Sequence, residues 1–234
     1  MPSRTLHRIT RSLLLIAALA APGCVSERGL VQNSALLGDE PAPVDPRRLH
    51  LELIEKMLES GKAHAALAHL DALSPKEAAA PTAQLLRGEA LRRMNRLDAA
   101  WRVYEPLLLT NAAAPAWRGL ALIKAEQGDL ETSIAWLRRA RDLQPTTARI
   151  RNDLGYALLL HGELAEAQDE LITALELEGS RRAARNLVLV LLLENQDESA
   201  QRLAQRHKIG DAGLERLRQR AERMRAHLAQ RSEG

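Results

Sequence analysis

From about residue 47 onward, apolar side chains recur at steps of three and four residues, which is the spacing of one face of an amphipathic helix. Residues that tolerate a left-handed backbone interrupt this helical pattern at intervals of 33 or 34 positions. They are Gly61, Asn95, Gly128, Gly162 and Asn195. A fixed period of this length, with one reversal in each period, predicts antiparallel helix pairs that stack into a solenoid.

Three positions, counted from each of these turn residues, carry side chains of a constant kind. Five residues after the turn the side chain is small, which lets the two helices approach closely: Ala66, Ala100, Ser133, Ala167 and Ala200. Eight residues before the turn we expect a large apolar residue that packs between helices: Leu53, Leu120, Leu154 and Leu187, with Arg87 in the second unit. Nine residues after the turn the side chain is again bulky, except in the last unit: Leu70, Tyr104, Leu137, Leu171 and Ala204. This pattern predicts units at about 47–80, 81–113, 114–147, 148–180 and 181–210.

The fourth unit resembles the tetratricopeptide consensus. The matching residues are Asp153-Leu154-Gly155-Tyr156-Ala157, then Gly162, Ala167, Leu171 and Ala174. The resemblance implies an all-α fold, a right-handed α-solenoid of about five helix pairs over 47–210. Residues 211–234 predict a C-terminal capping helix and tail, because apolar residues at helical spacing can cover the last repeat. These apolar residues are Leu214, Leu217, Ala221, Met224 and Leu228.

The capping helix also carries a cluster of basic residues. Five arginines outnumber the acids Glu215 and Glu222 there: Arg216, Arg218, Arg220, Arg223 and Arg225. Such a face attracts anionic lipid or an acidic partner in some proteins. The simpler interpretation, which we favour, is a solvated face of the cap.

The N-terminal residues have the pattern of an export signal. Arg4, Arg8 and Arg11 precede a short apolar stretch, Leu13 to Ala21, which is too short to span a bilayer, because about 20 apolar residues are needed. The chain's single cysteine follows in Ala21-Pro22-Gly23-Cys24, which resembles the lipobox of bacterial lipoproteins, although that motif usually has Leu where Ala21 stands. We therefore predict a lipoprotein signal peptide over 1–23 and a lipid on Cys24.

Ordinary cleavage after Ala18-Leu19-Ala20 is the alternative, and it would leave Cys24 as a free thiol in a soluble periplasmic protein. Lipidation is favoured, because an unpaired cysteine is a liability in an oxidising compartment. Residues 24–46 are rich in Ser, Gly, Asn, Asp and Pro and lack apolar periodicity. They predict a flexible tether between the anchor and the helices.

The distribution of charge argues against nucleic-acid binding. The chain has 33 basic and 30 acidic residues, but Arg4, Arg8 and Arg11 lie in the predicted signal peptide. The rest of the chain is therefore balanced, and it has few aromatic residues. It lacks both the positive charge and the stacking surfaces that nucleic-acid binding requires.

Motifs for catalysis or metal binding are absent from the sequence. There is no paired-cysteine metal site, no HExxH motif, no phosphate-binding glycine loop and no nucleophile elbow. His64 and His69 lie five residues apart, a spacing that does not put both on one helical face. We predict a protein that is not an enzyme and that uses no cofactor, metal or small-molecule substrate.

A stack of helix pairs instead offers a concave groove lined by the first helix of each unit. The tetratricopeptide register implies that this groove includes Arg118, Leu122, Arg149, Asn152, Tyr156, Arg185 and Leu189. Arg and Asn side chains suit the carbonyl and carboxylate groups of a protein or peptide segment, and Tyr offers a rigid apolar surface. A merely solvated surface is the alternative.

One segment goes beyond the generic repeat. Arg151-Asn152-Asp153-Leu154-Gly155-Tyr156-Ala157-Leu158, with its continuation through Leu171 to Leu177 and Arg182 to Leu187, resembles the TadD family. These are tetratricopeptide lipoproteins of the tight-adherence (Flp) pilus machinery. The resemblance implies an outer-membrane lipoprotein that faces the periplasm and acts as a pilotin or adaptor for the secretin subunit. It also implies sorting to the outer membrane, since Val25 rather than Asp follows the cysteine.

Two other classes of function remain open on the sequence alone. The same solenoid would serve as a periplasmic adaptor for cell-wall enzymes or for outer-membrane protein assembly. It would also serve as the docking subunit of an enzyme whose catalysis resides in a partner. The identity of the proteins that bind to this chain would distinguish these hypotheses.

Overall fold

The computed structural model describes residues 45–232, and no β-strand occurs in this range. The predicted signal peptide 1–23, Cys24 and all but the last two residues of the predicted tether 24–46 lie outside the described residues. The first helix begins at Pro46, one residue inside the predicted tether, because Asp45 caps it by accepting a hydrogen bond from the backbone N–H of Arg47 at 3.0 Å. None of the described helices is long and apolar enough to cross a bilayer.

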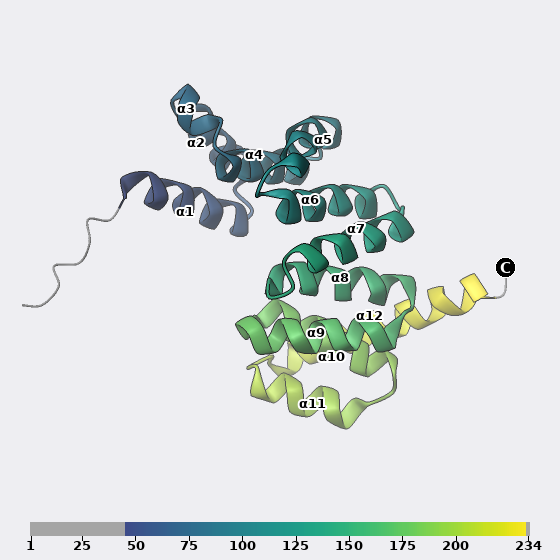
Figure 1. Ribbon diagram of the computed structural model, residues 1–234. Coiled ribbons are helices and arrows are strands. Elements are labelled where there is room, and N and C mark those ends of the chain that lie inside the picture. The colour runs from purple at the N-terminus through teal and green to yellow at the C-terminus, as the bar shows by residue number, and fades with distance from the viewer. Residues whose placement is uncertain (1–44, 233–234) are drawn as a thin grey trace, which may run out of the picture. The chain divides into compact units, whose positions relative to one another are not determined.

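The helices form consecutive pairs (Figure 1). The first helices of the pairs are α1 (Pro46–Glu59), α4 (Pro81–Arg93), α6 (Ala113–Glu126), α8 (Ala148–His161) and α10 (Arg181–Leu193). The second helices are α2 (Ala63–Asp71), α5 (Leu97–Tyr104), α7 (Leu130–Leu143), α9 (Leu164–Glu178) and α11 (Asp197–Arg206). The short helices α3 (Pro75–Ala78) and η2 (Glu105–Leu109, a 3-10 helix) connect the early pairs, and α12 (Asp211–Ser232) follows the last pair. The predicted all-α solenoid of about five helix pairs plus a C-terminal helix is confirmed.

The turns inside the pairs have the backbone conformation that their residues predict. All five predicted turn residues have a positive φ, from 57° at Asn95 to 98° at Gly162. In this left-handed region Gly carries no steric penalty and Asn carries a small one. The chain therefore reverses where the sequence spacing predicts, and the period of the repeat is set by these residues.

The small residues five positions after each turn are completely buried. Ala66, Ala100, Ser133, Ala167 and Ala200 each have 0% relative exposure. The large residues eight positions before the turn are buried at Leu120, Leu154 and Leu187, but Leu53 is 46% exposed, so this part of the prediction is wrong. The physical reason is that α1 is the first helix of the described range 45–232, in which no preceding pair packs against Leu53, so α1 buries Ile54 and Leu58 instead.

Tyr104 is the residue that joins the second pair to the third. Its ring lies between Gly88 of α4 and Gly119 of α6, and a Cβ atom at either glycine would clash with it. The side chain is 2% exposed, and this burial raises the pKa of Tyr104 above its ordinary value. Tyr104, the bulky residue nine positions after the turn, therefore packs against a helix of its own pair and against a helix of the next pair.

The C-terminal helix α12 packs mainly against α10. Its residues Leu214, Leu217 and Ala221 are buried in the same hydrophobic cluster as Leu189 of α10. The predicted cap therefore covers apolar surface of the last pair, as the terminal unit of a solenoid requires.

Candidate functional site

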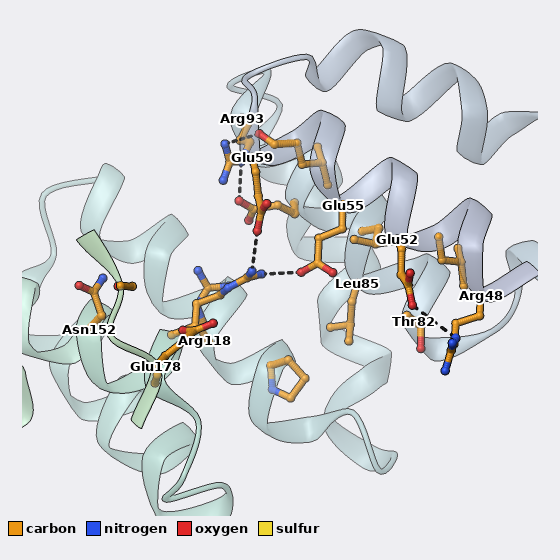
Figure 2. Close-up of a pocket in the computed structure, with 18 of the residues that line it drawn as sticks. Arg48, Glu52, Glu55, Glu59, Thr82, Leu85, Arg93, Arg118, Asn152 and Glu178 are labelled. Atoms are coloured by element: carbon orange, nitrogen blue, oxygen red, sulfur yellow. Dashed lines mark hydrogen bonds and ion pairs between the residues drawn. The ribbon is translucent and has the colours of Figure 1, made fainter. Parts of the chain in front are cut away.

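A groove of about 810 Å3 lies between α1 and the first helices of the following pairs (Figure 2). It is lined along most of α1 and α4, and by the N-terminal turns of α6, α8 and α10. Because the first helix of each pair contributes to one continuous surface, this groove corresponds to the concave face that a solenoid presents. Its size suits a short segment of polypeptide rather than a folded domain.

One wall of the groove is acidic. Glu52, Glu55 and Glu59 of α1 line it, and their spacing of three and four residues places them on one face of the helix. This row is not among the residues predicted to line the groove, although its helical spacing is visible in the sequence. What the sequence did not indicate is that α1 turns this face toward α8.

The opposite wall is basic. Arg118 of α6, Arg149 of α8 and Arg182, which follows the first residue of α10, line it, together with one acid, Glu178 of α9. Arg149 and Arg182 both stand at the second position of their helices, where the helix dipole adds to the positive potential. Because Arg47 and Arg48 also line the α1 wall and Glu178 the other, acids are in excess on the first wall and arginines on the second.

Arg149 joins the two walls across the groove. Its Nη1 donates to Glu55 Oε1 at 2.9 Å and its Nη2 donates to Glu59 Oε1 at 3.1 Å, as the dashed lines to Glu55 and Glu59 in Figure 2 show. The side chains remain 45%, 43% and 55% exposed for Arg149, Glu55 and Glu59. Ion pairs with this exposure contribute little to stability, because water and salt screen them.

The floor of the groove holds the carboxylate of Glu89 of α4, whose side chain is 14% exposed. It accepts hydrogen bonds from Arg92 Nη2 at 2.8 Å and from Arg93 Nε at 2.5 Å, while Arg92 also pairs with Glu126. Burial alone would raise the pKa of Glu89, but Arg92, with Arg118 and Arg93, lowers it to about 2. Glu89 is therefore ionised near neutral pH. Arg92 and Arg93 already donate hydrogen bonds to it.

Arg118 is likewise occupied by an internal partner. Its Nε donates to Asp153 Oδ2 at 2.6 Å, and the two side chains are only 14% and 10% exposed. Although burial lowers the pKa of a guanidinium, Asp153 and Glu89 raise the pKa of Arg118 above its ordinary value. Arg118 therefore acts as a link between α6 and α8 more than as a free cation.

The structure brings three of the predicted groove residues to the groove, namely Arg118, Arg149 and Asn152. Asn152 is only 5% exposed, and its amide is engaged on both sides. Its Nδ2 donates to Asp153 at 3.1 Å, and its Oδ1 accepts from Asn186 Nδ2 at 3.0 Å. Asn152 therefore shapes the wall and connects consecutive repeats.

The prediction for the C-terminal half of the concave face requires correction. Leu189 has 0% exposure, because α12 covers this side of α10. Tyr156 is half-buried, its hydroxyl accepts a hydrogen bond from Arg220 of α12, and the Arg220 guanidinium lies 5.4 Å from its ring centre. The cap thus occupies surface that the repeat register assigned to a partner. Leu122 is half-buried and Arg185 is exposed, and neither lines the groove.

Most of the basic face of α12 serves the same covering role. Arg220 contacts Tyr156, Arg225 Nη2 donates to the carbonyl of Leu192 at 2.5 Å, and Arg218 lies 3.9 Å from Asp197. Arg216 and Arg223 are exposed. The face is therefore largely a set of contacts to the folded body, and only Arg216 and Arg223 match the solvated cap face that the sequence favoured.

Two further clusters lie outside the groove. Trp136 is 5.6 Å from Trp101 and 5.5 Å from Trp117 between ring centres, and Lys124 lies 5.9 Å from the rings of Trp101 and Trp136. His69 pairs with His50 at 3.1 Å between ring nitrogens, whereas His64 is exposed. Within residues 45–232, no three His, Cys, Asp or Glu side chains are arranged to hold a metal ion.

Comparison with known proteins identifies the family that has this architecture. No protein-family model matches the chain. The TPR repeat-containing protein PA4299 of Pseudomonas aeruginosa is 37% identical over 194 residues, which cover 82% of this chain and 74% of that protein. The chain belongs to the tetratricopeptide repeat family.

Other tetratricopeptide repeat proteins share parts of the sequence or the fold. The crystal structure of TTC0263, a TPR protein of Thermus thermophilus, superimposes with a TM-score of 0.61 at 18% identity over 76% of this chain and 98% of that one. Tetratricopeptide repeat protein 36 of Bos taurus is 38% identical over 87 residues, 35% of this chain and 46% of that protein. These relatives carry the same repeat, which supports a protein-binding scaffold as the general role of this chain.

Proposed function

We propose that this tetratricopeptide repeat protein is a lipid-anchored, protein-binding scaffold in the assembly of the tight-adherence (Flp) pilus, where it acts as a pilotin or adaptor for the secretin. The observation that carries the binding role is the groove of about 810 Å3 between the acidic wall on α1 and the basic wall on α6, α8 and α10. The resemblance of residues 151–158 and their continuation to the TadD family supports the pilus role.

The proposed mechanism is mechanical. Acyl chains on Cys24 hold the protein at the periplasmic face of the outer membrane, and residues 24–46 give the folded repeats reach. The groove then binds a segment of the secretin subunit and concentrates that subunit at the membrane. Tethering raises the effective concentration of a bound partner without adding contacts to it.

Photo-cross-linking in cells that assemble the pilus tests the binding role. A photoreactive residue replaces Thr82, an exposed residue that lines the groove. The control replaces Leu109, which is 94% exposed on η2 and lies outside the groove. The expected result is a cross-link to the secretin subunit from position 82 and none from position 109. Capture of peptidoglycan synthases or outer-membrane assembly proteins from position 82 would favour the periplasmic adaptor instead.

Cell fractionation tests the anchor. Replacing Cys24 by Ser removes the thiol that would be acylated, so the protein is expected to move from the membrane fraction to the soluble periplasmic fraction. If Cys24→Ser leaves the membrane association unchanged, the lipid anchor is wrong. A soluble wild-type protein would favour ordinary signal cleavage.

A further inference from the structure

We infer that the groove recognises a short acidic helical segment, in which two carboxylates one helical turn apart take the place of Glu55 and Glu59 on Arg149. This inference rests on the proposed function, since it assumes that the groove binds a protein. It adds the chemistry of the bound segment, and it identifies α1 as an internal competitor for it.

The contact between α1 and α8 shows what Arg149 recognises. Its two terminal nitrogens contact two carboxylates that are separated by four residues on one helix, and these lie 94 and 90 positions earlier in the chain. A guanidinium presents its donors in a planar fork, so it discriminates between paired and single acceptors by geometry as well as by charge. A partner helix with the same spacing of acids presents the same pair of acceptors.

The internal contact is also weak enough to be exchanged. All three side chains are about half exposed, so water already surrounds the ion pairs on their open side. Glu55 and Glu59 can turn to solvent when a partner carboxylate takes their place, and α1 stays in position through its buried residues Ile54 and Leu58. An incoming acidic helix therefore replaces the two ion pairs of Arg149 and adds the contacts that it makes inside the groove.

The charge of the basic wall favours an acidic partner over a basic one. Within residues 45–232, Arg149 pairs with acids only on α1, and Arg182 makes no ion pair. Both arginines stand at helix N-termini, where negative charge is favoured. A basic segment would take Glu55 and Glu59 from Arg149, so that Arg149 as well as Arg182 would lack an ion pair.

A peptide titration tests the inference. The probe is an acetylated, amidated alanine-based helical peptide with Glu at positions i and i+4, and its counterparts carry Gln or Lys at both positions. Binding to the purified full chain is followed by NMR chemical shifts. The Glu peptide is expected to bind about tenfold more tightly than the Gln peptide, because two charge-assisted hydrogen bonds replace neutral ones.

Variants of the protein then assign the effect to Arg149. Arg149→Ala is expected to remove the preference for the Glu peptide. The matched control Arg139→Ala removes an exposed arginine of α7 outside the groove, and it should keep the preference. The double variant Glu55→Gln, Glu59→Gln removes the internal competitor, so it is expected to bind the Glu peptide several-fold more tightly than the wild type.

Three outcomes would overturn the inference. They are no binding of the Glu peptide, binding of the Gln or Lys peptide that is as tight, or weaker binding by the double glutamine variant. In the last case the contact of Arg149 with Glu55 and Glu59 would stabilise the fold instead of competing with a partner. Arg149→Ala would then lower the melting temperature. The cross-link from position 82 is independent of these results, so the groove can bind a secretin segment even if acid recognition is wrong.

Discussion

The two halves of the concave face are built from the same kind of helix and differ in what covers them. The half formed by α1, α4, α6 and the start of α8 is an open, charged groove. The half formed by the end of α8 and by α10 is covered by α12, and its apolar residues belong to the hydrophobic core. The repeat period is equal in both halves, so periodicity alone does not determine which part of a solenoid is available to a partner.

Both halves have a buried apolar core, but they differ in the contacts made at the concave face. Around the open groove, charged side chains hold consecutive helices together, as Arg92 of α4 does with Glu126 of α6 and Arg118 of α6 does with Asp153 of α8. Beneath α12, apolar contacts do so, with Leu189 fully buried. We therefore expect mutations beneath α12 to affect folding and mutations in the open groove to affect binding.

Deletion of residues 211–234 is expected to have the largest effect. It exposes Leu189 and removes the buried contacts of Leu214, Leu217 and Ala221, each worth on the order of 1–3 kcal/mol. The free energy of unfolding is expected to fall by several kcal/mol. The loss should be concentrated in α10 and α11. Hydrogen exchange measures it, and protection in α10 equal to that of the intact chain would show that α12 does not stabilise this half.

Leu189→Ala is expected to have the next largest effect. It leaves a cavity in the covered half and should lower the free energy of unfolding by about 2–5 kcal/mol. Leu177→Ala is the matched control, because Leu177 is 43% exposed and should cost less than about 0.5 kcal/mol. Urea denaturation measures both. Equal losses would mean that Leu189 is accessible in solution.

Glu89→Gln tests the charged floor of the open half. The carboxyl of Glu89 has a pKa of about 2 in the folded chain against an ordinary value of 4.5, so the folded state binds fewer protons than the unfolded state between these values. Its contribution, on the order of 3 kcal/mol, is present above about pH 4.5 and is lost as the pH falls toward 2. Denaturation at several pH values should show this loss in the wild type, and the part due to Glu89 should be missing in the variant.

Arg220→Ala tests a single contact of the cap. It removes the hydrogen bond to Tyr156 and the packing of the guanidinium on the ring, so a loss of about 1 kcal/mol is expected. Arg223→Ala is the control, since Arg223 is exposed on the same helix. If the two variants are equally stable, the contact of Arg220 with Tyr156 contributes nothing measurable.

Arg149→Ala is expected to have the smallest effect on stability. Its ion pairs to Glu55 and Glu59 are half exposed, so the free energy of unfolding should fall by less than about 1 kcal/mol. The measurement is a melting curve at low and high salt. A loss as large as that of Leu189→Ala would show that the open half depends on this bridge and would remove the contrast between the halves.

The repeat architecture could be predicted well from the sequence, and the groove only in part. Gly61 and its equivalents mark the turns, and Ala66 and its equivalents mark the close contacts, because both requirements are local to one helix pair. Leu53 was misassigned because its burial depends on a preceding pair, and none lies before α1 in residues 45–232. The acidic row on α1 was missed because its relevance depends on a contact with α8.

The amino-acid sequence by itself determined the period, the turns and the helical class of this protein, since left-handed residues and small residues at fixed spacing act within about one repeat. Only the tertiary structure decided which part of the concave face is open. That outcome depends on contacts between residues far apart in the chain, such as those of Arg149 with Glu55 and of Arg220 with Tyr156. The pattern along any one helix does not encode these long-range contacts.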